Sequence, residues 1–135
     1  MTPFVAGIAT QIMTAMQENS GSYSVQYTGV LALQQLLRCV DRKNLSENLP
    51  HSPQFCGLIP QVINTLCTAA NFHHGSLPMQ TNVFMAALYI LEYVPEARGI
   101  VIESRACELA ARARSTFHGN EHVKRVTKDF IAACL

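Results

Sequence analysis

The chain has 135 residues, of which 49% are hydrophobic and 14% charged, and its formal net charge at pH 7 is +1. The charged fraction lies below the average of about 25% for globular proteins, so much of the chain must be buried in a core or against a partner. A chain of this length forms one hydrophobic core by default, and we expect a single domain over residues 1–135. No run approaches the roughly 18 to 20 apolar residues of a membrane span, and the N-terminus lacks a secretory signal pattern.

Apolar residues recur at helical spacing along nearly the whole chain, and no segment alternates as a half-buried strand does. This pattern predicts an all-α fold. The predicted helices cover residues 3–18, 23–39, 59–71, 77–93, 97–117 and 120–134. The first begins at Pro3 after the N-cap Thr2, and Asn19-Ser20-Gly21 ends it. The polar segment 41–57 contains Pro50 and Pro53 and is predicted to be a long inter-repeat loop.

Two of the predicted helices have distinctive side chains. The helix over residues 77–93 has no charged residue between Met79 and Leu91, which predicts that it is buried on all sides. The helix over residues 97–117 has an apolar stripe and, on its outer side, Arg105, Glu108 and Arg112. The sequence therefore predicts that the first of these helices is covered by neighbours and that the second has a charged outer stripe.

Three segments of 13 residues align without gaps when they begin at Val25, Met79 and Val123. Apolar residues coincide at the first, ninth, twelfth and thirteenth positions. The second spacing, 44 residues, lies in the range of about 40 to 47 typical of HEAT and armadillo repeats, and the first, 54 residues, is longer. The polar loop over residues 41–57 accounts for the extra length, so the sequence predicts three related helix pairs.

Segment 14–33 contains Ala15-Met16 before a short polar turn, and then Val25-Gln26, Gly29 and Ala32-Leu33 in a long helix. This arrangement resembles a unit of the armadillo and HEAT-like helical repeat families. The second unit keeps Met79-Gln80, whereas the third has Lys124 in place of the glutamine. The resemblance implies a short right-handed α-solenoid of about three armadillo-like helix pairs. It also implies a non-enzymatic scaffold that presents a helical surface to a protein or peptide partner.

Two sets of residues are candidates for binding that partner. Arg98, Arg105 and Arg112 are spaced seven apart and are predicted to share one helix face, either as a solvated surface or as a docking site for an acidic peptide. Nucleic acid is the weaker alternative, because the net charge is only +1 and no aromatic residues interleave with the arginines. The resemblance implies that Tyr27 and Tyr89 line a groove, and the alternative is that both pack between helices.

The C-terminal helix ends in the apolar run 130–135, which would make a poor polar cap for a stack of helices. This predicts that Phe130, Ile131 and Leu135 form an interface. The interface would join two copies of the chain as a homo-oligomer or continue a longer array.

The sequence contains no motif of a nucleophilic, phosphate-binding or paired-carboxylate site, and we expect no enzyme activity, no metal and no cofactor. His73 and His74 are adjacent and cannot face one direction on a helix. Two alternatives stay open: a helical bundle that binds a small apolar ligand near Met79, Phe84 and Leu88, and an enzyme whose site is not recognisable. An odd number of widely spaced cysteines favours a reducing compartment, the cytoplasm or the nucleus.

Overall fold

The computed structural model describes residues 2–40 and 57–135, and these residues form helices and no strand. The predicted all-α fold is confirmed, whereas the predicted loop at 41–57 lies, except for Gly57, outside the described residues. The α-helices are α1 (Thr2–Glu18), α2 (Tyr23–Val40), α4 (Ile59–Phe72), α5 (Leu77–Tyr93), α6 (Arg98–Glu103), α7 (Ala106–Thr116) and α8 (Glu121–Cys134). A short 3-10 helix, η3 (Pro95–Ala97), joins α5 to α6. None of the helices in the described part of the chain is long and apolar enough to cross a membrane.

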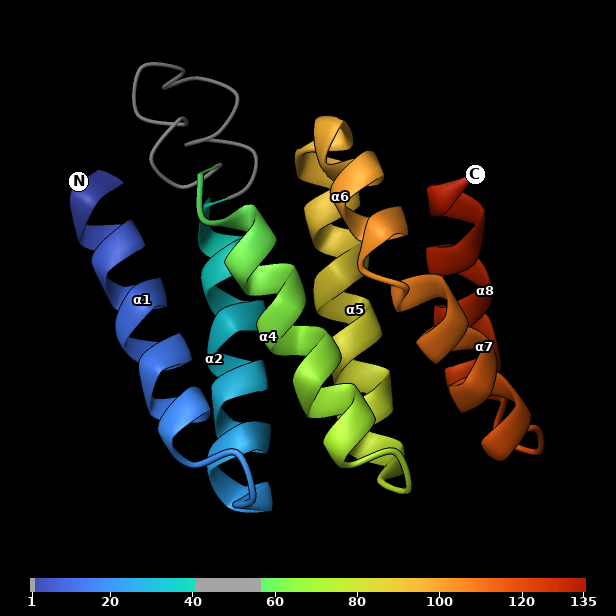
Figure 1. The fold of residues 1–135 in the computed structure, drawn as a ribbon. Helices are drawn as coiled ribbons and strands as arrows, with labels where there is room; N and C mark the ends of the chain where they lie inside the picture. The colour runs from blue at the N-terminus through green and yellow to red at the C-terminus, as the bar shows by residue number, and fades with distance from the viewer. Residues whose placement is uncertain (1, 41–56) are drawn as a thin grey trace.

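The helices lie in two layers, with the two termini at opposite ends of the row (Figure 1). One layer contains α1, α4, α6 and α7, and the other contains α2, α5 and α8. Helix α5 contacts α2, α4 and α8, which makes it the central element. Its residues Met79, Val83, Phe84 and Ile90 are almost completely buried, as expected for a helix with no charged side chain between Met79 and Leu91.

Three helical hairpins, α1–α2, α4–α5 and α7–α8, have the same hydrogen-bonded turn. The side-chain oxygens of Ser22, Ser76 and Asn120 accept hydrogen bonds from the backbone N–H three residues later, at 3.3, 3.2 and 3.0 Å. These caps satisfy N–H groups that the first turn of a helix leaves unpaired. The three capping residues are 54 and 44 residues apart, the same spacings as the aligned segments.

A buried glutamine strengthens the turn in the first two hairpins. The Gln26 Nε2 donates to the backbone oxygens of Met16, at 2.6 Å, and Asn19, at 3.1 Å. The Gln80 Nε2 donates to the equivalent oxygens of Ala70, at 2.9 Å, and His73, at 3.1 Å. Each glutamine thus satisfies carbonyls at the end of the preceding helix. In the third hairpin the equivalent Lys124 forms an ion pair with Glu121 instead, at 3.7 Å.

The predicted continuous helix over residues 97–117 is wrong, because the chain breaks it between α6 and α7. Arg105 adopts the left-handed conformation, with φ 66° and ψ 21°. The Ser104 Oγ donates to the backbone oxygen of Val101, at 2.6 Å, and accepts from the N–H of Ala106, at 3.3 Å. The serine therefore caps both helices and replaces the hydrogen bonds of a continuous helix with its own.

Candidate functional site

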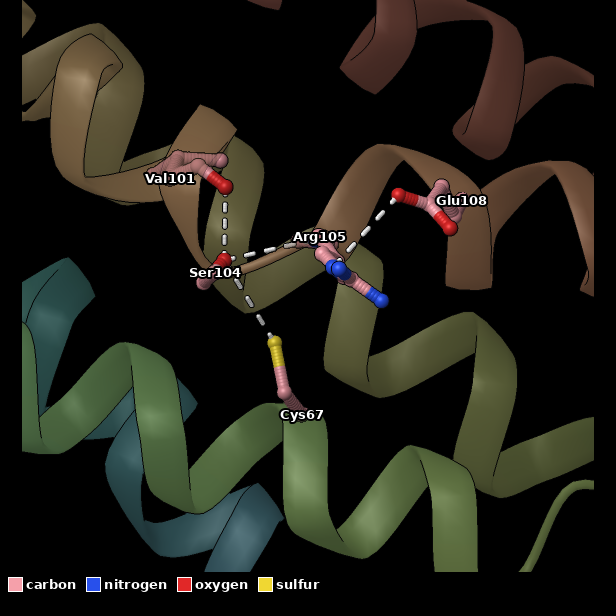
Figure 2. Close-up of polar contacts among 6 residues, drawn as sticks. Cys67, Val101, Ser104, Arg105 and Glu108 are labelled. Carbon is pink, nitrogen blue, oxygen red and sulfur yellow. Dashed lines mark hydrogen bonds and ion pairs between the residues drawn. The ribbon is translucent and has the colours of Figure 1, made fainter.

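A polar cleft lies where the joint between α6 and α7 passes over α4. We call it the α4–α7 cleft; its lining residues are Cys67, Thr68, Asn71, Ser104, Arg105, Glu108 and Leu109. Figure 2 shows Ser104 at its centre, between the backbone oxygen of Val101 and the thiol of Cys67. The Cys67 Sγ donates to the Ser104 Oγ at 3.8 Å. The side chain of Arg105 lies 4.0 Å from the Glu108 carboxylate, and both are largely exposed.

Burial raises the pKa of two cysteine thiols, Cys67 in the α4–α7 cleft and Cys134 on α8. Burial raises the pKa of the Cys67 thiol above its ordinary value, although the hydrogen bond with Ser104 acts in the opposite direction. Burial, with a hydrogen bond to Cys107, raises the pKa of Cys134 to about 12. Since the thiolate is the reactive form, neither side chain is activated near neutral pH. Among the described residues no group of His, Cys, Asp and Glu side chains could hold a metal ion. The polar side chains that line the α4–α7 cleft, among them Asn71, Arg105 and Glu108, can donate or accept hydrogen bonds.

The three arginines predicted to share a helix face lie in three different settings. Arg98 is on α6, and its Nη1 donates to the backbone oxygen of Leu135 at 2.7 Å. Arg105 is at the joint, at the mouth of the α4–α7 cleft. Arg112 is on α7, where its Nη1 donates to the Asn71 Oδ1 at 3.1 Å. The prediction of one stripe is wrong because it assumed a continuous helix, and only Arg105 and Arg112 lie near the same cleft.

Tyr27 contacts the neighbouring hairpin. Its ring stacks on that of Tyr23, with centroids 5.6 Å apart, and its hydroxyl accepts from the Asn82 Nδ2 at 3.4 Å. Tyr23 in turn shares a hydrogen bond of 2.9 Å with Ser76. Tyr27 is therefore half-buried between α2 and α5, in agreement with the alternative in which it packs between helices.

Tyr89 is also half-buried and packs against the core. Its ring stacks on Tyr93 of the same helix, with centroids 6.1 Å apart. Tyr89 lies on α5, the helix whose Asn82 contacts Tyr27, and the prediction that both tyrosines line one groove stays a prediction.

Phe130 is a core residue, so its predicted place in an interface is wrong. It has 0% of its surface exposed and packs on Phe84, with ring centroids 5.5 Å apart. Of its predicted partners, Ile131 is half-buried and Leu135 is 88% exposed. Met79 and Phe84, suggested as ligand contacts, are likewise buried in the core.

The outward side of α8 is polar. It exposes Glu121, Arg125, Lys128 and Asp129, and Ile131 borders a shallow groove with Arg114, His118 and Lys124. The outward side of α8 therefore carries several charged side chains, whereas the sequence suggested an apolar end.

The opposite end of the molecule has an apolar surface that the sequence reasoning missed. We call it the α1–α2 groove; its lining residues are Ile12, Ala15, Met16, Ser24, Val25, Thr28, Gly29 and Ala32. None of them is charged. A signal was present in the sequence, since Glu18 is the only charged residue before Arg38. Gly29 keeps α2 close to α1, because a Cβ at this position would overlap the Sδ and Cγ of Met16.

The described residues form an all-α protein of three helical hairpins packed in two layers. In comparisons with known proteins, the chain matches no family model, no curated protein and no solved structure.

Proposed function

We propose that the chain is a non-enzymatic protein-binding scaffold, a short right-handed α-solenoid of armadillo-like or HEAT-like hairpins. The observation that carries this proposal is the recurrence of one capped turn at Ser22, Ser76 and Asn120. Hairpins of this kind bury their apolar faces by stacking, and the stack then presents an extended surface to partners. The free cysteines Cys67, Cys107 and Cys134 are compatible with work in the cytoplasm or nucleus.

The partner is an acidic segment of another protein that docks in the α4–α7 cleft. Arg105 supports this assignment, because a non-glycine residue in the left-handed region costs about 1–2 kcal/mol and such residues cluster at functional sites. Its side chain is 80% exposed, and its Nε lies 4.0 Å from the carboxylate of the solvated Glu108. An exposed ion pair of this kind contributes about 0–1 kcal/mol, so a partner carboxylate can replace Glu108 at little cost.

The test is affinity capture from cell extract with quantitative mass spectrometry. We expect Arg105→Glu to lose proteins that the wild type retains, and Arg105→Lys to retain them in part because the positive charge is kept. The matched control is Arg125→Glu, which makes the same charge change at an exposed position on α8. Binding should weaken as salt rises from low to about 0.5 M, since salt screens exposed charges.

Recovery of the same proteins by wild type and all three variants would show that the α4–α7 cleft is not the docking site. If the wild type captures no protein in larger amount than an unrelated control protein does, the proposed scaffold function is contradicted. Circular dichroism of each variant establishes that the loss of a partner is not a loss of fold.

A further inference from the structure

Five of the eight residues that line the α1–α2 groove are equivalent to residues that are almost completely buried in the other two hairpins. The turn spacings of 54 and 44 residues relate five groove positions, Ile12, Ala15, Val25, Gly29 and Ala32, to positions in the later hairpins. The equivalents in α4 and α5 are Leu66, Ala69, Met79, Val83 and Ala86, and each is at most 1% exposed. The equivalents in α7 and α8 are Ala110, Ala113, Val123, Thr127 and Phe130, and each is at most 2% exposed.

In the later hairpins the preceding hairpin covers this face. Helix α2 packs on α5, and α5 packs on α8. The first hairpin has no predecessor among the described residues. Its groove is consequently open, with Ala15 and Thr28 exposed and Ile12, Val25 and Ala32 half-buried.

The two ends of the molecule differ in charge. At the C-terminal end, Arg125 stands where the earlier hairpins have Tyr27 and Thr81, and Lys128 stands where they have Val30 and Phe84. Both basic residues are exposed. Burying these two charges against an apolar groove would cost desolvation free energy that no opposite charge in the groove offsets. The C-terminal end of a second copy is therefore a poor occupant of the α1–α2 groove.

We propose that the occupant is the same groove of a second copy of the chain, in a two-fold dimer. A two-fold contact brings identical surfaces together, and here both are uncharged and apolar, so no like charges are opposed. Helices α1 and α2 have 17 and 18 residues and are each about 25 Å long. Side by side they form a face roughly 20 Å wide, so the projected area of this face is about 500 Å². Because side chains roughen it, such a face approaches the roughly 800 Å² of accessible surface that each partner buries in a standard interface.

The dimer is closed, because the polar C-terminal end stops further addition. The proposed scaffold therefore works as a pair, with the two α4–α7 cleft sites available at the same time. This inference rests on the equivalence of the three hairpins and does not require the proposed acidic partner.

The test is the mass of the purified full chain in solution, by light scattering coupled to size-exclusion chromatography. We expect twice the 14.9 kDa of one chain. Ala15→Arg should weaken the dimer at least about tenfold, since an arginine in the contact must be desolvated. The matched control is Ala132→Arg, at an exposed alanine of α8, which should leave the dimer intact. Thr28→Lys provides a second change in the groove if Ala15→Arg disturbs the fold.

A wild-type chain that stays monomeric up to about 100 μM would overturn the proposal, since an interface with a dissociation constant of about 10 μM would be mostly dimeric there. A dimer that survives both groove variants, or that only Ala132→Arg breaks, would also overturn it. If the chain is a monomer but captures proteins through Arg105, the dimer is contradicted and the proposed function is supported. If the chain is a dimer but captures no protein, the dimer is supported and the proposed function is contradicted.

Discussion

At the scale of single residues, Arg105 is the position where the backbone departs most from what its residue type prefers. It is the only non-glycine residue with positive φ among the described residues. Glycine adopts this region without steric cost, and a β-branched residue adopts it least well. The side chain is largely exposed, so packing does not impose the conformation, and the hydrogen bonds of the neighbouring Ser104 Oγ to Val101 and Ala106 accompany it.

We therefore expect Arg105→Gly to keep or raise the melting temperature and Arg105→Val to lower it. In Arg105→Gly, removal of the backbone strain stabilises the folded state by about 1–2 kcal/mol. The extra entropy of glycine stabilises the unfolded chain by about 0.5–1 kcal/mol, which offsets part of that gain. Thermal unfolding followed by circular dichroism compares the two variants. Equal melting temperatures for Arg105→Gly and Arg105→Val would mean that residue 105 is not left-handed in solution.

At the scale of helices, the first two hairpins fill the space between their paired helices with different side chains. Hairpin α1–α2 pairs the large Met16 with Gly29, and at the equivalent positions hairpin α4–α5 has the small Ala70 with Val83. All four residues are buried. Since cores tolerate swaps that conserve volume, the two combinations are alternative ways to fill one space between paired helices.

This exchange predicts that Gly29→Val destabilises the protein and that Met16→Ala with Gly29→Val is the better tolerated combination. The valine alone collides with Met16, whereas the double variant recreates the Ala70–Val83 pair. In urea unfolding, the loss of stability in the double variant should fall short of the sum of the single losses by at least about 1 kcal/mol. Additive losses would mean that the two side chains do not share one space.

At the scale of the whole molecule, Phe130 joins the third hairpin to the rest. It lies on the buried side of α8 and packs on Phe84 of the central helix α5. Helix α8 presents Val123, Val126 and Cys134 on the same buried side. The apolar C-terminal run is thus used partly within the molecule, through Phe130 and Cys134, whereas Ala132 and Leu135 are exposed.

Phe130→Ala should reduce the free energy of unfolding by about 3–5 kcal/mol, because it removes a buried ring and leaves a cavity. Leu135→Ala, at an exposed position, should change it by no more than about 0.5 kcal/mol. Denaturant unfolding of the two variants checks this difference. If Phe130 were instead a surface contact between copies, its replacement would change the mass in solution and leave the unfolding of one chain almost unchanged.

The sequence by itself determined the features that depend on neighbours in the chain. Hydrophobic spacing and turn residues predicted helix starts at residues 23, 59 and 77, which are the observed first residues of α2, α4 and α5. The 54- and 44-residue spacings came from the apolar positions of three aligned segments, and the capping residues Ser22, Ser76 and Asn120 have the same spacings.

The tertiary structure alone decided which apolar faces are covered. Periodicity marks Phe130 and Ile12 as members of apolar stripes in the same way, yet Phe130 packs on Phe84 in the core, whereas Ile12 is half-buried in the open α1–α2 groove. Likewise, Ser104 and Arg105 match a helical pattern, and the break between α6 and α7 depends on hydrogen bonds that the pattern does not reveal. The physical reason is that burial is a property of contacts between distant segments, whereas periodicity records only which side of a helix is apolar.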